Sequence, residues 1–226
     1  MKLLPLIVIR PEPGNAATIA AARERGLHAI GYPLFRIEPT RWSVAEGRFE
    51  AILAGSANIF RHGGPQLDAL KHLPVIAVGE ATASAARAAG FTVVRTGEGG
   101  LQPVVETLAP GTYLRLAGED RVTLAPPPGV RIETAVVYAA RPVPLPDELV
   151  AVLARPAVVL LHSGAAAKHF RQQCERTGIT RESLYLACLA PRIAALAGDG
   201  WGDLRIADSR TDSDLLELGR RMCQTM

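Results

Sequence analysis

Small polar turns that follow apolar runs are the best candidates for chemistry in this sequence. Each comes directly after a short aliphatic run, and the candidate positions are Ser56, Asn58, Gly79, Thr82, Gly118 and Ser163. If the runs are parallel strands, the turns lie at the sheet edge where open α/β proteins bind ligands. We expect a helix after each turn, and its free N–H groups favour anions such as carboxylates. The alternative for any single position is a plain helix cap.

Two further side chains could act on a ligand held by these turns. Arg10 ends the first apolar run, where its guanidinium could contact an anion or, equally, form a salt bridge with a neighbouring carboxylate. Tyr138 lies in the extended segment 135–142, where its hydroxyl could serve as a proton donor or weak acid. The alternative for Tyr138 is an aromatic side chain that only packs against a domain.

Several common cofactor and metal signatures are missing. The first apolar run leads into Arg10-Pro11-Glu12-Pro13-Gly14 rather than a Gly-x-Gly-x-x-Gly turn, and no Walker loop or Gly-x-Ser-x-Gly elbow occurs. Neither the histidines nor the cysteines have metal-ligand spacing, so we predict no metal site. The residues concerned are His28, His62, His72, His162, His169, Cys174, Cys188 and Cys223.

Composition narrows the class of protein further. The formal net charge is +3 over 226 residues, and no run of five like charges occurs, so we expect no nucleic-acid partner. An odd number of scattered cysteines fits a reducing cytoplasm. No apolar stretch reaches the roughly 18–20 residues of a membrane span. The apolar run 3–9 is interpreted as a first buried strand rather than a signal peptide.

The order of apolar and Ala-rich segments predicts an α/β fold with parallel sheets. The run 6–9 precedes an expected helix with Asn15 as N-cap and Gly26 as its stop. Residues 75–91 align with 185–201 at an offset of 110, and Ser56 matches Ser163 at an offset of 107. We therefore predict two similar parallel-sheet α/β domains.

Two proline-flanked extended segments, 33–39 and 135–142, are the expected crossings between these domains. If both cross, residues 36–141 form a second domain that is inserted into the first, which comprises 1–35 together with 142–226. The crossings then form a two-stranded linker. We expect the polar turns to face a cleft between the two lobes.

The chain resembles the uroporphyrinogen-III synthase family over nearly its whole length. The order and spacing of several short motifs carry the resemblance. They are Arg10-Pro11, Pro33-Leu34, Ile52 to Asn58, Ala77 to Ala83 with Gly90-Phe91, Gly99-Gly100, Leu116 to Arg121, and Val137-Tyr138.

The resemblance implies a cofactor-free lyase of tetrapyrrole synthesis. Its substrate, hydroxymethylbilane, loses the terminal hydroxyl as water. Ring D is then inverted through a spiro intermediate, and the macrocycle closes as uroporphyrinogen III. The implied fold is two α/β lobes with a two-stranded linker. We expect a cytoplasmic monomer without a membrane partner, and hand-over of the substrate by the upstream deaminase stays open.

The resemblance also assigns roles to individual residues. Tyr138 matches a tyrosine proposed to assist departure of the hydroxyl, and Ser56, Thr82 and Ser163 match polar positions that line the family's cleft. Where many members have Gly-Pro-Thr-Thr, this chain has Leu189-Ala190-Pro191-Arg192. Arg192 therefore offers a positive charge to a substrate carboxylate in place of two hydroxyls.

Two other functions stay open at the level of sequence. One is a two-lobed, non-catalytic binding protein for a small anionic ligand, which the same turns would serve. The other is a family member that has lost activity, for which the altered turn at Arg192 is the only indication. Turnover separates the synthase from both.

Overall fold

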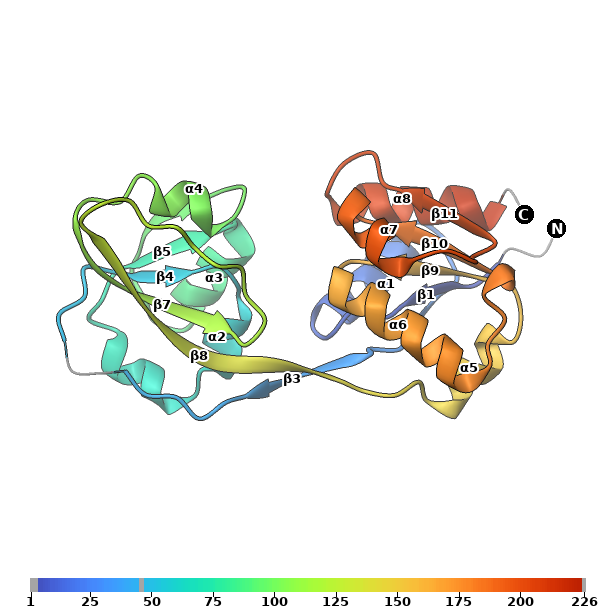
Figure 1. Cartoon of the computed structure of the whole chain (residues 1–226), viewed down its shortest axis with the longest axis horizontal. Coiled ribbons are helices and arrows are strands. Elements are labelled where there is room, and N and C mark those ends of the chain that lie inside the picture. The colour runs from blue at the N-terminus through green and yellow to red at the C-terminus, as the bar shows by residue number, and fades with distance from the viewer. Residues whose placement is uncertain (1–3, 45–46, 225–226) are drawn as a thin grey trace. The chain divides into compact units, whose positions relative to one another are not determined.

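The computed structural model describes residues 4–44 and 47–224, and it is a mixed α/β structure built on parallel sheets (Figure 1). The chain divides into two compact units, each with its own sheet. Unit 1 comprises the chain up to Arg36 together with the chain from Pro142 onward, and unit 2 comprises Ile37–Arg141. The division falls within strand β3 (Phe35–Pro39) and near the end of strand β8 (Val130–Pro142).

Unit 1 holds a five-stranded sheet in the order β11-β10-β9-β1-β2, in which the neighbouring strands run parallel. Its strands are β1 (Leu6–Val8), β2 (Ala29–Gly31), β9 (Ala157–Leu161), β10 (Leu184–Cys188) and β11 (Asp203–Ile206). Its helices are α1 (Gly14–Glu24), α5 (Asp147–Leu153), α6 (Gly164–Thr177), α7 (Pro191–Ala197) and α8 (Asp212–Gln224), with a 3₁₀ turn at Arg181–Ser183.

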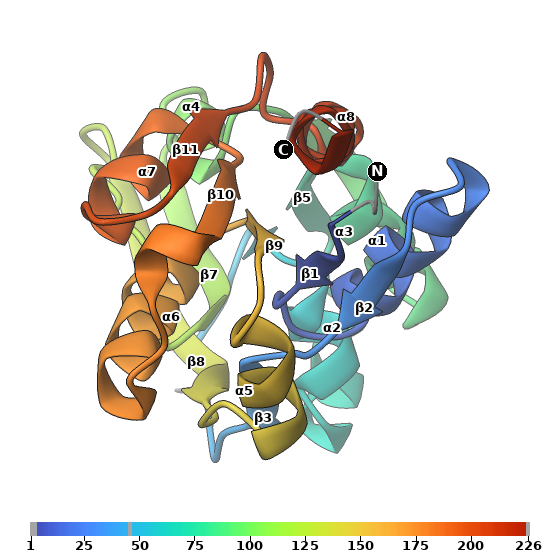
Figure 2. The ribbon, with the colours of Figure 1, turned by 90° about the vertical axis from the view of Figure 1, so that its right-hand side faces the viewer.

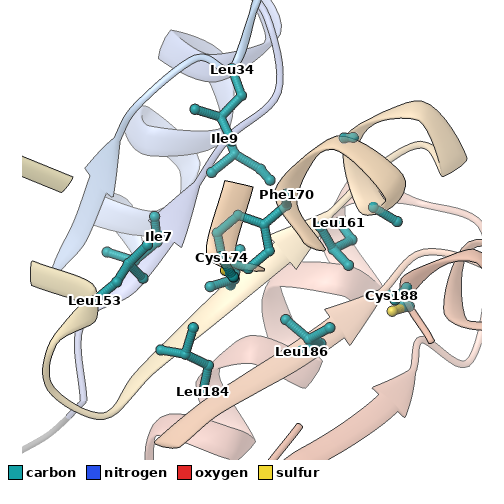
Figure 3. Packing of buried hydrophobic residues seen from close by; sticks show 14 of the residues in the cluster. Ile7, Ile9, Leu34, Leu153, Leu161, Phe170, Cys174, Leu184, Leu186 and Cys188 are labelled. Atoms are coloured by element: carbon teal, nitrogen blue, oxygen red, sulfur yellow. The ribbon is translucent and has the colours of Figure 1, made fainter. Parts of the chain in front are cut away.

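Helices cover both faces of this sheet. Successive residues of a strand point to opposite sides, so each strand contributes side chains to both helical layers. Ile7, Val159 and Leu161 face α5, α6 and α7, and Phe170 of α6 lies in the middle of that cluster (Figure 3). Val8 packs with residues of α1 and α8 on the other side. Figure 2 shows these two helices on the side of the sheet opposite to α6 and α7. The central strand β9 is buried along its whole length, as a strand covered on both faces requires.

Unit 2 holds a six-stranded sheet in the order β3-β8-β7-β4-β5-β6. Parallel pairs join β4 to β5, β4 to β7, β5 to β6 and β7 to β8. Its further strands are β4 (Ile52–Ala54), β5 (Val75–Val78), β6 (Val93–Gly97) and β7 (Gly111–Gly118). Its helices are α2 (Asn58–His62), α3 (Glu80–Ala88) and α4 (Leu101–Val105), with a 3₁₀ helix η1 at Pro65–Leu70.

The two faces of the unit 2 sheet are covered unequally. On one face, Ile59 of α2, Leu67 of η1 and Ala83 of α3 pack against the strands. On the other face, the only helical cover in the described residues is Leu101, Val104 and Val105 of the five-residue helix α4. This second face is therefore the thinner one.

The strand orders of the two sheets correspond when β4 is matched with β9. The strands β6, β5, β4, β7 and β8 then correspond, in this order, to β11, β10, β9, β1 and β2. One connection differs. Helix α1 lies between β1 and β2, whereas residues 119–129 between β7 and β8 contain no helix.

Two local predictions were wrong. The turn at Gly118 precedes no helix, because residues 119–129 include Pro126-Pro127-Pro128, which lack the amide hydrogens a helix needs. Asn15 is not an N-cap, since α1 begins at Gly14 with Pro13 as its N-cap. The Asn15 amide instead donates to the carbonyls of Val8 (2.8 Å) and Arg10 (3.1 Å), and so holds the end of β1.

Candidate active site

A cavity of about 230 Å³ opens in unit 2 at the carboxyl ends of β4 and β7. These two strands are parallel neighbours in the middle of the sheet. From β4 the chain proceeds outward to β5 and then β6, whereas β7 begins the other half of the sheet. The strand order therefore reverses between β4 and β7, and open α/β sheets bind ligands in the crevice at such a reversal.

Three of the predicted site residues line this cavity together: Ser56, Gly118 and Tyr138. Ser56 follows β4, and its Oγ accepts a hydrogen bond of 3.2 Å from the Asn58 N–H. Gly118 ends β7 and is the register partner of Tyr138 on β8. The parallel sheet thus places residues that are far apart in sequence at one edge.

The ring of Tyr138 lies directly over Gly118. A Cβ added to Gly118 would come within 2.7 Å of the tyrosine Cζ, so only glycine leaves this space to the ring. The Tyr138 backbone is fixed as well, because its carbonyl accepts a 2.9 Å hydrogen bond from the Glu119 N–H. Its hydroxyl has no hydrogen-bond partner among the described residues, which leaves it available to a ligand in the cavity.

The other predicted residues of unit 2 do not line the cavity. Asn58 begins α2, and its side-chain oxygen accepts a 3.4 Å hydrogen bond from Arg61. Gly79 is the N-cap of α3 with a φ of 77°, in the left-handed region that glycine tolerates. Thr82 is buried within α3. The structure therefore gives these three residues local roles in helix starts and packing.

The remaining predicted residues belong to unit 1. Arg10 follows β1, and its guanidinium donates to the Asp212 carboxylate of α8 and to the Thr18 hydroxyl, the latter at 3.3 Å. Ser163 is the N-cap of α6, where its side chain accepts a 3.1 Å hydrogen bond from the Ala166 N–H. Arg192 is the second residue of α7 and is exposed.

His162, which precedes Ser163, lies in the same part of unit 1 as Arg10. Its side chain is 8% exposed, and its Nε2 is 3.7 Å from the Asp212 carboxylate. Burial, and then the positive charge of Arg10, lowers the pKa of His162 to about 4, while Asp212 opposes that shift. The imidazole is therefore neutral at neutral pH.

Arg115 is a buried charged residue of the cavity that sequence reasoning missed. It stands in the middle of β7 between Leu114 and Leu116, which both belong to the hydrophobic core, and it is only 6% exposed. Burial, with a smaller contribution from the charge of Arg121, lowers the pKa of Arg115. The available signal was a charged residue inside an otherwise apolar central strand, where burial on both faces disfavours one.

The described residues offer neither a metal cluster nor a membrane-spanning helix. Among residues 4–44 and 47–224, no group of three or more His, Cys, Asp or Glu side chains could hold a metal ion. In the same ranges no helix combines the length and apolar composition needed to cross a bilayer.

Comparisons with known proteins identify the family. The model of a family described as "Uroporphyrinogen-III synthase HemD" matches residues 16–217. A crystal structure of uroporphyrinogen-III synthetase from Helicobacter pylori 26695 is similar, with a TM-score of 0.64 and 16% identity over 97% of this chain and 100% of that chain. A mutant uroporphyrinogen III synthase from the extremely thermophilic bacterium Thermus thermophilus gives a TM-score of 0.51 and 14% identity over 99% and 100%.

At these identities the two structures show a shared fold. A comparison with curated protein sequences gave no match. The family assignment depends on the family model, which spans most of the sequence. The chain belongs to the uroporphyrinogen-III synthase family.

Proposed function

We propose that the chain carries out the reaction of its family at the cavity between β4 and β7, with Tyr138 assisting loss of the substrate hydroxyl. The reaction itself follows from the family. The chain is a cofactor-independent lyase that dehydrates and cyclises hydroxymethylbilane to uroporphyrinogen III. The single observation that supports the proposed site is the Tyr138 hydroxyl, which lines the cavity without a hydrogen-bond partner among the described residues.

The chemistry requires little from the protein beyond a hydrogen-bond donor and a fixed geometry. Loss of the hydroxyl as water needs a proton at the leaving oxygen, and Tyr138 would donate a hydrogen bond there. The adjacent pyrrole nitrogen stabilises the resulting azafulvene cation. The substituted carbon of ring D must then attack first, and holding the bilane in that conformation is the main catalytic task.

We propose that polar turns in both units contact carboxylates of the substrate. In unit 2 these are Ser56 and Gly118, which line the cavity, and Asn58 and Gly79, whose sequence neighbours Ile59 and Val78 line it. Thr82 is included as well, although it is buried and could contact the substrate only if α3 moved. In unit 1 they are Arg10, Ser163 and Arg192. Arg10 is bound to Asp212, so contact with a substrate would require it to share or exchange that partner.

We also propose the domain boundaries, the linker, the oligomeric state and the cellular location. We take residues 1–35 with 142–226 and the inserted residues 36–141 as two similar domains, with β3 and β8 as the two-stranded linker. Neighbouring positions of β3 and β8 in one sheet support this arrangement. We propose a cytoplasmic monomer, a location supported by the free and buried thiols of Cys174, Cys188 and Cys223. Hand-over of the bilane by the upstream deaminase is part of the same proposal.

Product isomer analysis tests the function. Purified protein receives freshly generated hydroxymethylbilane, and the products are oxidised and separated by chromatography. We expect mainly the type III isomer, beyond a protein-free control that closes spontaneously to type I. Only type I at the spontaneous rate, from a demonstrably folded sample, would refute the activity.

A second experiment tests the role of Tyr138. We expect Tyr138→Phe to lower turnover by about 100-fold, because it removes the proposed donor to the leaving oxygen, while the protein stays folded. Tyr185→Phe is the matched control, since Tyr185 lies in β10 of unit 1 and does not line the cavity. Unchanged turnover with the same isomer ratio would exclude Tyr138 from the mechanism.

A further inference from the structure

Arg115 places a positive charge among apolar residues of the thinly covered face of unit 2. Its partners in the sheet register are Leu53 on β4 and Thr134 on β8. Leu53 belongs to the apolar cluster of that face, together with Tyr113, which lies two residues earlier on β7. Arg115 nevertheless lines the cavity, and with Glu119 and Arg121 it also lines a second cavity of about 490 Å³.

The hydrogen bonds of Arg115 leave one edge of its guanidinium free. Nη1 donates to the carbonyl of Val122 at 2.9 Å. Nε is buried without a hydrogen-bond partner, and within the described residues none is found for Nη2 either. Nε and Nη2 form the side-on edge with which arginine binds both oxygens of a carboxylate.

No carboxylate of the described chain neutralises this region fully. Arg121 lies in the same cavity, and its Nη1 donates only to the backbone carbonyls of Glu119 (2.8 Å) and Gly118 (3.5 Å). Glu119 is paired with Arg141 at 2.6 Å instead. Asp120 lines the cavity without an ion pair to any described residue, so two guanidiniums face one carboxylate there.

A buried charge without a partner destabilises a folded protein, because the group has lost its water and gained no compensating interaction. An anion that enters the cavity would supply that interaction. The substrate class of the family carries eight carboxylates, which makes a carboxylate the fitting anion.

We propose that the free edge of Arg115, with Arg121 beside it, binds one carboxylate arm of the tetrapyrrole substrate in the cavity between β4 and β7. This inference rests on the proposed function and adds a side chain that recognises the substrate. Arg115 contributes to binding of the bilane and takes no part in proton transfer or in the choice of isomer.

Binding of the product tests the proposal directly. Uroporphyrinogen III, kept reduced under anaerobic conditions, is titrated into the parent protein and into Arg115→Met by calorimetry. We expect the Kd of Arg115→Met to rise about tenfold or more, because a charge-assisted pair of hydrogen bonds is lost. Arg121→Met should weaken binding by a smaller factor. Arg95→Met on β6 is the matched control, since Arg95 is exposed and does not line the cavity.

Kinetics and unfolding separate recognition from a merely structural role. We expect a raised KM with unchanged kcat and an unchanged fraction of type III isomer. We also expect the Tm of unliganded Arg115→Met to be no lower than that of the parent. A lowered Tm with parental product affinity would show that Arg115 only braces the loop at Val122, and would overturn the proposal.

Two further variants keep the test decisive if Arg115→Met does not fold. Arg115→Lys keeps the charge but lacks the side-on edge, and Arg121→Met changes an exposed side chain. Both must weaken product binding, and parental affinity in the two folded variants overturns the proposal. Failure of the proposed function looks different, because the parent would then give only the type I isomer whatever the variants bind.

Discussion

The connections that leave β1 and β7 occupy corresponding places in the two sheets, yet they are built differently. In unit 1 the connection contains α1, and the arginine that follows β1, Arg10, is paired with Asp212 of α8. In unit 2 the connection is the helix-free segment 119–129, and Arg115 of β7 has no acidic partner among the described residues. The same strand order thus supports two different edges. In unit 1 the arginine is paired with a carboxylate of the chain, and in unit 2 the arginine has none among the described residues and is proposed to bind a carboxylate of the substrate.

The helices that cover the corresponding faces also differ in length, and the shorter one again belongs to unit 2. Helix α8 follows β11 with 13 residues, whereas α4 follows the matching strand β6 with only five. Short cover leaves room at the sheet edge, and the 230 Å³ cavity lies there. This difference indicates that a ligand can bind at such a sheet only where the loops and helices between its strands leave the carboxyl edge uncovered.

The largest effect should come from filling the space between Gly118 and Tyr138. Gly118→Val places a side chain where a Cβ alone would lie 2.7 Å from the tyrosine Cζ, so the ring must leave its position. We expect turnover to fall by about 100-fold or more, the loss typical of a displaced catalytic group. Turnover and the isomer ratio are measured on a variant shown to be folded by circular dichroism.

The control for this substitution is Gly47→Val, since a Cβ at Gly47 meets only ring atoms of Phe49 at an ordinary 3.8 Å. It should retain parental turnover. Full activity of a folded Gly118→Val protein would contradict the view that the covered and uncovered edges differ in function.

A pH effect of intermediate size should come from His162 of unit 1, where unit 2 has Gly55 at the matching position. Burial, and then the charge of Arg61, also lowers the pKa of the more exposed His62 in unit 2. For His162 the folded pKa of about 4 lies below the unfolded value of 6.5, so the unfolded chain takes up a proton first as pH falls. Stability from this group is complete above pH 6.5 and is lost towards pH 4, on the order of 3 kcal/mol.

Urea unfolding at pH 7, 5.5 and 4 measures this loss. His162→Gln should flatten the dependence, whereas His72→Gln should leave it unchanged, since His72 is exposed. An equally steep profile in His162→Gln would assign the acid sensitivity to other groups, with Asp212 and Arg10 as the charges facing this histidine.

The smallest effect concerns the two matched serines. Ser163→Ala removes the N-cap of the 14-residue helix α6, and we expect it to lower the free energy of unfolding by about 1 kcal/mol. Ser56→Ala affects a five-residue helix and should cost less stability but raise KM, because Ser56 lines the cavity. If Ser163→Ala instead raised KM and Ser56→Ala lowered the free energy of unfolding more, then Ser163 would be the substrate contact and Ser56 the structural cap.

Much of the fold could be predicted from the alternation of apolar runs and Ala-rich segments. The run Val158 to Leu161 falls within β9, and Val75 to Val78 is β5, both in parallel sheets. The rule that ligands bind at carboxyl edges also selected Ser56 and Gly118, whereas the crossing segment 135–142 and the family resemblance pointed to Tyr138. All three line one cavity. Local pattern sufficed in these cases because burial on both faces dictates an apolar strand.

The remaining features depend on contacts that local pattern does not encode. Arg10 and its partner Asp212 are separated by 202 positions, so no spacing in the sequence connects them. Asn15 was assigned to a helix start because its type favours caps, whereas tertiary contacts hold it to the carbonyls of β1. Arg115 was treated as one member of an apolar run, although a buried charge in such a strand is unusual and indicated a functional residue.

The division of the chain has a consequence for its synthesis on the ribosome. Once Pro142 has emerged, every strand of the unit 2 sheet is available for pairing. The unit 1 sheet is still incomplete then, because the neighbour of β1 is β9, which begins at Ala157. The apolar strand β1 therefore waits with one edge unpaired while a folded unit 2 separates it from its partner. Chaperone demand during translation should accordingly concentrate on β1, although β1 precedes every other strand of its sheet in the chain.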